Sequence, residues 1–448
     1  MNDIELVGAA SHLGTLSTRL LQAVPNEAGA MLLCHAHETP SNRRRVLVRD
    51  ILDVPQEFYI EQRPDRLTID PIFLARTFKR AKSEESSVFL AHTHPFSRWP
   101  QFSPVDDDGE ARLIPAIFAR LNNRPHGSLV LGEEGFSARL YSTPQRVAPV
   151  DSMVLVGREL RRETKDERSM PVYDMHDRNV RAFGQGQQKL QRMSVGIVGL
   201  GGIGSLVVEQ LAHLGVGSLV LIDFDTLEST NLNRVVGARP DLVGMPKVRV
   251  AEQLINKINP TISVQAVANS VLKEATTRQL LDCDLIFCCT DSHGSRAVVN
   301  QMSYQYLIPV IDTGVRIDAR NGKIASMAGR VQMLAPDLPC LLCSNLLDSE
   351  EIRRDFLTDT QRKADPYITG YSEPQPAVVS INGVVASLAV TMFLSIAVGI
   401  PSPGRHLLYL VGQSTVRRVG NERSRDCVVC SARGAYARAD DWQMIWQR

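Results

Sequence analysis

The pattern of apolar and polar positions divides the chain into two parts. In the first 150 residues, short apolar runs alternate with polar turns and predict strands at 31–34, 46–48, 88–91 and 128–131. The run from Ile72 to Lys82 follows Pro71 and predicts a helix. This part is expected to be an α+β domain.

In the second part, strand and helix patterns alternate. Apolar runs at 195–199, 219–222, 285–289 and 310–312 predict strands. The segments 205–214, which Gly215 follows, and 247–259, which Pro260 follows, predict helices. Alternation of this kind is typical of a doubly wound, Rossmann-like α/β fold.

A charged segment separates the two patterns. Residues 157–169 are mostly charged and predict a solvated linker or linker helix. We therefore expect a first domain at 1–150, a linker at 151–172 and a second domain at 173–448.

One long apolar segment lies in the second domain. No charged residue occurs from Pro374 to Gly404, and 377–400 is long enough to span a membrane. Its small polar residues suit close helix packing, so a core or dimer-interface helix is expected in preference to a membrane helix. A net charge of +1 gives no sign of nucleic-acid binding. The N-terminus has no signal-like pattern, so the expected location is cytoplasmic.

The first domain contains a metal-binding pattern. His92 and His94 flank one residue of a predicted strand, so both imidazoles can point to the same side. Asp106 follows twelve residues after His94 and can return as a third ligand. Two histidines, one carboxylate and an open position for water form a catalytic zinc set.

The string His92-Thr-His-Pro95, seven residues, then Ser103-Pro-Val-Asp106 resembles the JAB/MPN (JAMM) metalloprotease family. The resemblance implies an upstream glutamate as general base, and Glu27, before the apolar run at 31–33, fits that place, with Glu38 as the second candidate. It also implies that Ser103 steadies the oxyanion, and that the bound metal is a catalytic zinc.

The second domain opens on a glycine-rich turn between a predicted strand and helix. Its glycines, which suit a backbone approach to phosphates, are Gly199, Gly201, Gly202 and Gly204. Asp223 follows nineteen residues after Gly204, where a ribose-binding acid belongs. By itself this pattern also fits a nicotinamide dehydrogenase, which remains a weak alternative.

The later motifs separate these interpretations. Asp223-Phe-Asp225, Asn231-Leu-Asn-Arg234, Gly244-Met-Pro-Lys247 and Thr290-Asp291-Ser292 follow in order and resemble the ThiF/MoeB superfamily, the fold of ubiquitin-activating enzymes, over about 173–435. The resemblance implies ATP-dependent adenylation of a carboxylate, with Asp223 on the ribose and Asn231 beside the phosphates. Arg234 and Lys247 would neutralise phosphate charge, and Asp291 would hold Mg²⁺. In the homodimers of that superfamily, an arginine of the first helix reaches the partner's ATP, and Arg178 is the matching position.

Two Cys-x-x-Cys pairs, Cys340/Cys343 and Cys427/Cys430, match the structural zinc site of the same superfamily. Four thiolates give a closed tetrahedral site. A structural zinc is therefore expected in addition to the catalytic one.

The crossover loop that carries the acceptor cysteine in ubiquitin-activating enzymes corresponds to about 369–377 and contains no cysteine. Cys34, Cys283, Cys288 and Cys289 are expected to be core residues. We therefore expect pyrophosphate exchange without a stable enzyme thioester. An oxyester at Ser372 or Thr369 is the weaker alternative, because an unactivated hydroxyl is a poor nucleophile.

Taken together, these patterns predict a bifunctional enzyme that acts on one ubiquitin-like partner. Its second domain would adenylate the partner's C-terminal glycine, and its first would hydrolyse peptide or isopeptide bonds at that terminus. A downstream conjugating protein is a further possible partner. The alternatives are activation of a sulfur-carrier protein with trimming of the carrier, and a non-catalytic scaffold that binds a ubiquitin-like partner.

Overall fold

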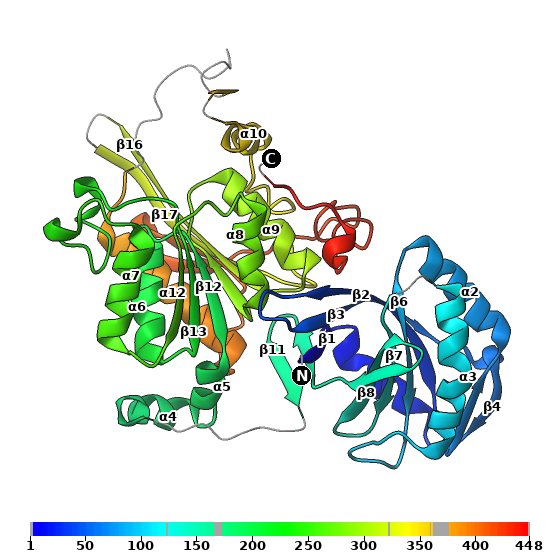
Figure 1. The fold of residues 1–448 in the computed structure, drawn as a ribbon. Coiled ribbons are helices and arrows are strands. Elements are labelled where there is room, and N and C mark those ends of the chain that lie inside the picture. Colours follow the sequence, from blue (N-terminus) through cyan, green and yellow to red (C-terminus); the bar gives the residue numbers. More distant parts are fainter. Residues whose placement is uncertain are drawn as a thin grey trace. The chain divides into compact units, whose positions relative to one another are not determined.

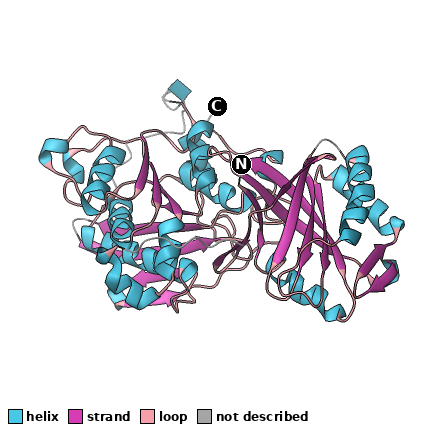
Figure 2. Cartoon of the chain, turned by 60° about the horizontal axis from the view of Figure 1, so that its bottom comes forward, coloured by secondary structure: helices cyan, strands magenta, loops and turns pink. Residues whose placement is uncertain are grey.

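The computed structural model describes residues 3–121, 124–164, 173–320, 323–358, 360–361 and 376–446. The chain divides into two compact units. Unit 1 comprises Met1–Glu167 with the later segments Gln305–Leu307 and Ala435–Gln443, and unit 2 comprises the remainder. Each unit is built on a sheet flanked by helices (Figure 2).

Unit 1 contains a nine-stranded mixed sheet in the order β11-β10-β1-β3-β2-β6-β7-β8-β9 and a separate β4-β5 pair. Its strands are β1 (Ile4–Ala9), β2 (Gly29–Glu38), β3 (Arg44–Asp53), β4 (Tyr59–Arg63), β5 (Arg66–Ile69), β6 (Ser87–Thr93), β7 (His126–Leu131), β8 (Phe136–Thr143), β9 (Arg146–Pro149), β10 (Ser152–Val156) and β11 (Leu160–Thr164). Its α-helices are α1 (Leu16–Leu20), α2 (Pro71–Ser83) and α3 (Pro104–Arg120) (Figure 1).

The alternation along β2 explains why helices cover both faces of this sheet. Leu32 belongs to a core with Leu16 of α1, whereas Met31 and Leu33 belong to a second core with residues of α2 and α3. Successive side chains of a strand point to opposite faces, so one apolar run supplies both cores. The strands and the helix predicted from the apolar pattern of this part are present.

The segment interpreted as a charged linker contains two strands of this sheet. β10 pairs in parallel with β1, and β11 pairs antiparallel with β10. Arg162 of β11 bonds to Glu5, which is buried on β1. Residues 160–164 therefore form an edge strand of the sheet and not a linker or a linker helix, although Arg161 and Arg162 on this strand are exposed. Residues 165–172 lie outside the described part.

A segment from near the C-terminus also belongs to unit 1. Asp441 lies in Ala435–Gln443, and its carboxylate accepts a hydrogen bond from Arg124 and bonds to Nδ1 of buried His35 at 2.7 Å. The predicted domain at 173–448 is therefore not one contiguous unit in the structure.

Unit 2 contains an eight-stranded sheet in the order β14-β13-β12-β15-β16-β17-β18-β19. Its strands are β12 (Ser194–Val198), β13 (Ser218–Ile222), β14 (Ser263–Val267), β15 (Leu285–Cys288), β16 (Val310–Arg320), β17 (Lys323–Leu334), β18 (His406–Leu410) and β19 (Thr415–Arg418). Its described α-helices are α4 (Asp177–Phe183), α5 (Gly186–Arg192), α6 (Gly202–Leu214), α7 (Lys247–Ile258), α8 (Glu274–Thr277), α9 (His293–Gln305), α10 (Ser349–Phe356) and α12 (Val379–Ala397).

The strand order of unit 2 reverses at β12. The chain runs from β12 outward to β13 and β14, then returns to β15 on the other side of β12 and continues to β16, all in parallel. Helices α6, α7 and α12 lie on one side of the sheet, and α8 and α9 on the other (Figure 1). Ligands of such folds bind at the carboxyl ends of the strands beside this reversal. The doubly wound prediction is confirmed.

Helix α12 is the predicted long apolar helix. Among the described residues it is the one helix long and apolar enough to cross a membrane. Most of its side chains are buried, and it packs against α6, β16 and β17. This is the packing of a core helix.

The buried ion pair of unit 1 makes a pH prediction. Burial alone would raise the pKa of Glu5, but the charges of Arg162, Arg45 and Arg43 outweigh burial and hold the pKa at about 2. A carboxyl whose pKa is lowered on folding stabilises the protein above its unfolded pKa, and that stability is lost as pH falls through the folded pKa. The free energy of unfolding should therefore fall by about 3 kcal/mol between pH ~5 and pH ~2.

Urea unfolding of wild type and Glu5→Gln, measured across this range, tests the prediction. The variant should lose about 3 kcal/mol at pH 7, because three arginines lose their buried partner, and it should show a flatter pH profile. Glu159→Gln, an exposed change just before β11, is the control. Equal profiles for wild type and Glu5→Gln would contradict the assignment.

Candidate functional site

The glycine turn after β12 is the centre of the candidate nucleotide site. Gly199 has φ +89°, and a Cβ at this position would lie 2.9 Å from the carbonyl group of Cys289. A Cβ at Gly204 would lie 1.9 Å from the carbonyl oxygen of Gly199. Only glycine allows the start of α6 to approach the end of β12 this closely. Gly201 faces open space, so its backbone is accessible to a ligand.

A cavity of ≈ 370 Å³ opens beside this turn, at the carboxyl ends of β12, β13 and β15. The strand-order reversal thus predicts its place. Of the residues predicted to bind ATP and Mg²⁺, those that line the cavity are Gly199, Gly201, Gly202, Asp223, Asp225, Arg234, Lys247 and Asp291.

Asp223 supports the turn. Its Oδ2 accepts a hydrogen bond of 2.6 Å from the amide of Leu200, and its Oδ1 accepts one of 2.8 Å from the amide of Asp225. Burial raises the pKa of this carboxyl, although the amide bonds oppose the shift. Each oxygen keeps a second lone pair, so Asp223 can still accept a hydrogen bond from a ligand hydroxyl.

The two cations of the predicted site have protein partners. Lys247, the first residue of α7, forms an ion pair of 2.7 Å with Asp225. Arg234 donates to the carbonyl of Thr230 at 2.6 Å and to Asn233 Oδ1 at 3.1 Å. A phosphate entering the cavity would compete for cations that are already positioned and partly desolvated.

Asn231 does not line the cavity. It is buried, and its Oδ1 accepts a hydrogen bond of 3.1 Å from the amide of Glu228, which closes a short turn. The Asn231 carbonyl then accepts from the amide of Arg234 at 3.1 Å. Asn231 therefore helps to position the segment that carries Arg234, and its place beside the phosphates stays a prediction.

The loop that carries Asp291 is braced by a residue that the sequence did not reveal. Asp355 of α10 accepts hydrogen bonds of 2.8 Å from the Ser292 hydroxyl and from the amide of Gly294 at the start of α9. The carboxylate satisfies free amides of the α9 N-terminus. No sequence motif marked Asp355, since the contact joins positions about sixty residues apart.

Cys289 also lines the cavity, unlike Cys34, Cys283 and Cys288, which are buried as predicted. Burial raises the pKa of the Cys289 thiol to about 12. The thiolate is the nucleophilic form of cysteine, so this thiol is a poor nucleophile at neutral pH.

Two other predictions concern residues away from this cavity. Arg178 lies on α4, is exposed and does not line the cavity, so its role across a dimer stays a prediction. Of the predicted crossover loop, residues 369–375, which include Thr369 and Ser372, lie outside the described residues.

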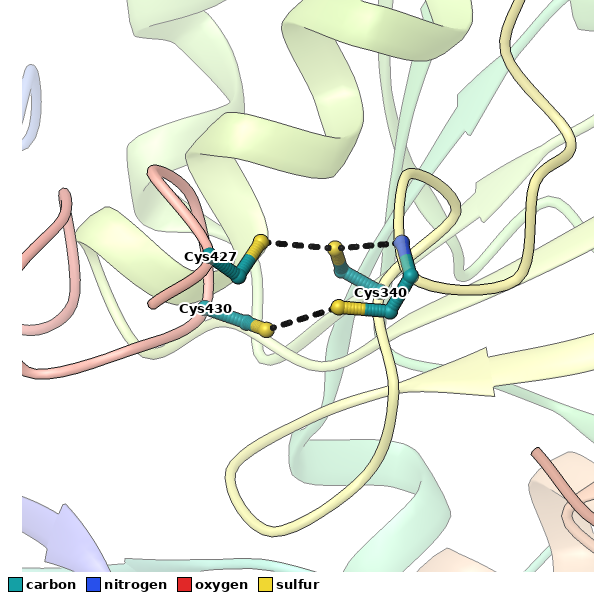
Figure 3. Close-up of side chains that lie close together, drawn as sticks. Cys340, Cys427 and Cys430 are labelled. Carbon is teal, nitrogen blue, oxygen red and sulfur yellow. Dashed lines mark hydrogen bonds between the residues drawn. The ribbon is translucent and has the colours of Figure 1, made fainter. Parts of the chain in front are cut away.

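Four cysteines of unit 2 converge as predicted (Figure 3). The Cys340 and Cys427 sulfurs lie 3.6 Å apart, as do those of Cys343 and Cys430. Tetrahedral zinc with Zn–S bonds of about 2.3 Å requires S···S separations of about 3.8 Å. Backbone amides of Cys343 and Ser424 donate to the sulfurs of Cys340 and Cys343. Such bonds favour thiolates, so the set fits a structural zinc.

A second group that could hold a metal lies in unit 1. Nε2 of His92 is 2.9 Å from Asp106 Oδ1, and Nε2 of His94 is 3.3 Å from Oδ2. The two Nε2 atoms are 3.3 Å apart. Burial alone would raise the pKa of Asp106, but hydrogen bonds from both histidines lower it well below its usual range. Three ligand atoms thus face one point, as the strand and loop spacing predicted.

Helix capping places Asp106 at this point. Ser103 is the N-cap of α3 and Asp106 its third residue, and each side chain accepts the other's backbone amide hydrogen bond. The Ser103 hydroxyl hydrogen is not used by this bond and remains available. The sequence Ser-Pro-Val-Asp therefore begins helix α3 and also orients the Asp106 carboxylate toward the two histidines.

Of the two candidate bases, Glu27 lies at the metal group and Glu38 does not. Glu27 Oε1 is 3.7 Å from His94 Nε2. Glu27 lies shortly before Gly29, the residue of β2 that pairs with His92. Burial raises its pKa to about 7. Glu38 ends β2 at the opposite end, where it is exposed and pairs with Arg44. The second candidate is therefore wrong on position.

The fold and cavity of unit 2 define a Rossmann-like α/β domain with a glycine-rich turn at the cavity. A model described as ThiF family matches residues 176–429, more than half of the chain, and the chain belongs to the ThiF family. The match leaves the first 175 residues outside it.

Curated relatives of this domain include adenylyltransferases and activating enzymes. Ubiquitin-like modifier-activating enzyme 5 of Oryza sativa is 31% identical over 35% of this chain and 39% of its own length. Molybdopterin-synthase adenylyltransferase of Salmonella typhimurium is 29% identical over 55% of this chain and 90% of its own length. Sulfur carrier protein ThiS adenylyltransferase of Escherichia coli is 28% identical over 56% and 90%. The chain thus spans about two fifths of the first of these relatives.

Among solved structures, E. coli MccB with ATP is similar at 23% identity and a TM-score of 0.46, over 58% of this chain and 75% of that one.

Loss of the cysteine group should destabilise unit 2. Cys343→Ser removes one of four ligands, so bound zinc should fall and the free energy of unfolding should drop by about 3 kcal/mol at a zinc concentration ~100 times the Kd. Zinc content by mass spectrometry and thermal melting measure both effects. Ser424→Ala is the control, because it keeps the backbone amide that donates to Cys343. Unchanged zinc content in Cys343→Ser would reject the site.

Proposed function

We propose that this protein adenylates the C-terminal glycine of a ubiquitin-like or sulfur-carrier protein with ATP and Mg²⁺. The observation that carries the proposal is the cavity at the strand reversal, where the glycine turn, Arg234, Lys247 and Asp291 meet in a chain of the ThiF family. Similarity to activating enzymes of ubiquitin-like modifiers and to the ThiS adenylyltransferase supports the substrate class.

The reaction needs positioning and charge compensation more than covalent catalysis. A carboxylate oxygen of the substrate forms a bond to the α-phosphorus, and the bond from that phosphorus to the oxygen of the β-phosphate breaks. The products are an acyl adenylate and pyrophosphate. Arg234 and Lys247 would offset the charge that develops on the phosphates, Asp223 would hold the ribose, and Asp291 would hold Mg²⁺.

The acceptor of the acyl group is proposed to lie outside this chain. The predicted crossover loop has no cysteine. Cys289 is the cysteine in the cavity, and its raised pKa keeps the thiol protonated. This favours release of the adenylate to a conjugating protein or a sulfur donor over an enzyme thioester. A homodimer in which Arg178 reaches the partner's ATP is part of the same proposal.

A second activity is proposed for unit 1: hydrolysis at the C-terminus of the same partner. It is favoured by the convergence of His92, His94, Asp106 and Glu27. The three ligands would hold a zinc ion, which when bound lowers the pKa of its water and polarises a carbonyl. Glu27 would accept a proton from the water, and the Ser103 hydroxyl, already oriented by α3, would donate to the oxyanion. A scaffold that binds without turnover is the alternative.

Lys247→Ala should lower ATP–pyrophosphate exchange by about two to three orders of magnitude, because transition-state charge loses a positioned cation. Exchange of labelled pyrophosphate into ATP, with a glycine-ending ubiquitin-like protein present, measures this. Lys257→Ala, at the exposed end of the same helix, should match wild type. Absence of exchange in wild type would reject adenylation, and a DTT-sensitive adduct on a cysteine would reject the proposed external acceptor.

Glu27→Gln should lower the hydrolytic rate at least ~100-fold, because the amide cannot accept the water's proton. The substrate is a ubiquitin-like protein whose C-terminal glycine is extended by a short reporter peptide. Glu38→Gln on the same strand is the matched control and should cleave as wild type does. If Glu27→Gln cleaves at the wild-type rate, Glu27 is not the base.

A further inference from the structure

Asn382 is a buried amide in the nucleotide cavity that the predicted site does not use. It lies in the first turn of α12, is 4% exposed and lines the cavity. Its backbone amide donates to the Val378 carbonyl, and no hydrogen bond of its side chain to another described residue is seen. Because the side chain lines the cavity, this amide is placed to bind a ligand there.

The geometry directs this amide to the glycine turn. A Cβ built at Gly202 would lie 2.3 Å from Nδ2 of Asn382 and 3.3 Å from its Cγ, so the NH2 end is the nearer one. The Cδ of Arg234 lies 3.5 Å from the same point. The absence of a side chain at Gly202 thus leaves room for the amide beside the cation.

The surroundings favour an anionic occupant. Helices α6 and α12 pack together, both begin at this cavity, and neither has a side chain capping its first amides. Three carboxylates also line the cavity: Asp223 is bonded to backbone amides, Asp225 is paired with Lys247, and Asp291 is the residue proposed to hold Mg²⁺. Two helix N-termini and a guanidinium attract phosphate oxygens, not a neutral group.

We infer that Asn382 binds the triphosphate of ATP, its Nδ2 donating to a phosphate oxygen held between the glycine turn and Arg234. This rests on the proposed adenylation. It adds a ligand contact from the helix that directly follows the crossover loop, so nucleotide binding and the start of α12 are linked through one side chain.

The test uses the full chain and measures Kd for ATP and for adenosine by isothermal titration calorimetry. Asn382→Leu keeps the size but removes the donor, and should weaken ATP binding about tenfold or more while adenosine binding stays within about twofold. Asn382→Asp places a charge against the phosphates and should weaken ATP binding further. Thr391→Val, an exposed polar-to-apolar change on the same helix, should bind both as wild type does.

Melting of the nucleotide-free proteins separates ligand binding from a structural role. Because the Asn382 side-chain amide has no partner among the described residues when nucleotide is absent, nucleotide-free Asn382→Leu should melt at or above the wild-type temperature. A lower melting temperature, equal loss of ATP and adenosine affinity, or unchanged ATP affinity would each overturn the inference. If the wild-type protein does not bind ATP, both the proposed adenylation and the role of Asn382 are rejected. If wild type and Asn382→Leu bind ATP equally well, only the role of Asn382 is rejected.

Discussion

The nucleotide site depends on one backbone contact, the approach of the Gly204 Cα to the Gly199 carbonyl. A single methyl group there would lie 1.9 Å from that oxygen, so any other residue would push α6 away from β12. The displacement would move the α6 N-terminus from the cavity and break the bond that Asp223 makes with Leu200. The glycine turn, the acid that braces it and the helix α6 that begins at it therefore form one unit, and the surrounding side chains are placed relative to it.

Charge in this cavity is arranged before a ligand binds. Lys247 is held by Asp225, and Arg234 by a carbonyl and an amide oxygen. The side chains have thus lost much of their conformational freedom already, so a phosphate that replaces these partners meets a smaller entropic cost. Binding is therefore an exchange of acceptors, and its net free energy is the difference between them.

Local patterns predicted the parts of the fold that depend on local physics. The strand that delivers His92 and His94, the glycine turn and both cysteine pairs follow from periodicity and spacing, and the structure has them in place. Sequence could not reveal contacts whose partners are remote. The ion pair of Arg162 with Glu5 joins positions 157 apart, and Asp355 carried no motif because it bonds to the loop and the first turn of α9. Asn231 occupies a matching motif position and its side-chain oxygen bonds within a turn, so its place beside the phosphates stays a prediction.

The two metal groups differ in a way that bears on their proposed roles. The cysteine group is closed, since four sulfurs surround one point and use every position of a tetrahedral ion. The group in unit 1 supplies three atoms, and Glu27 Oε1 lies 3.7 Å from Nε2 of His94. Three protein ligands leave one position of a four-coordinate ion open to water. A closed set can only hold its ion, whereas an open one can present water to a carbonyl. An ion held by the four cysteines would therefore have to lose a ligand before it could bind water. An ion held by His92, His94 and Asp106 could bind water without losing a ligand.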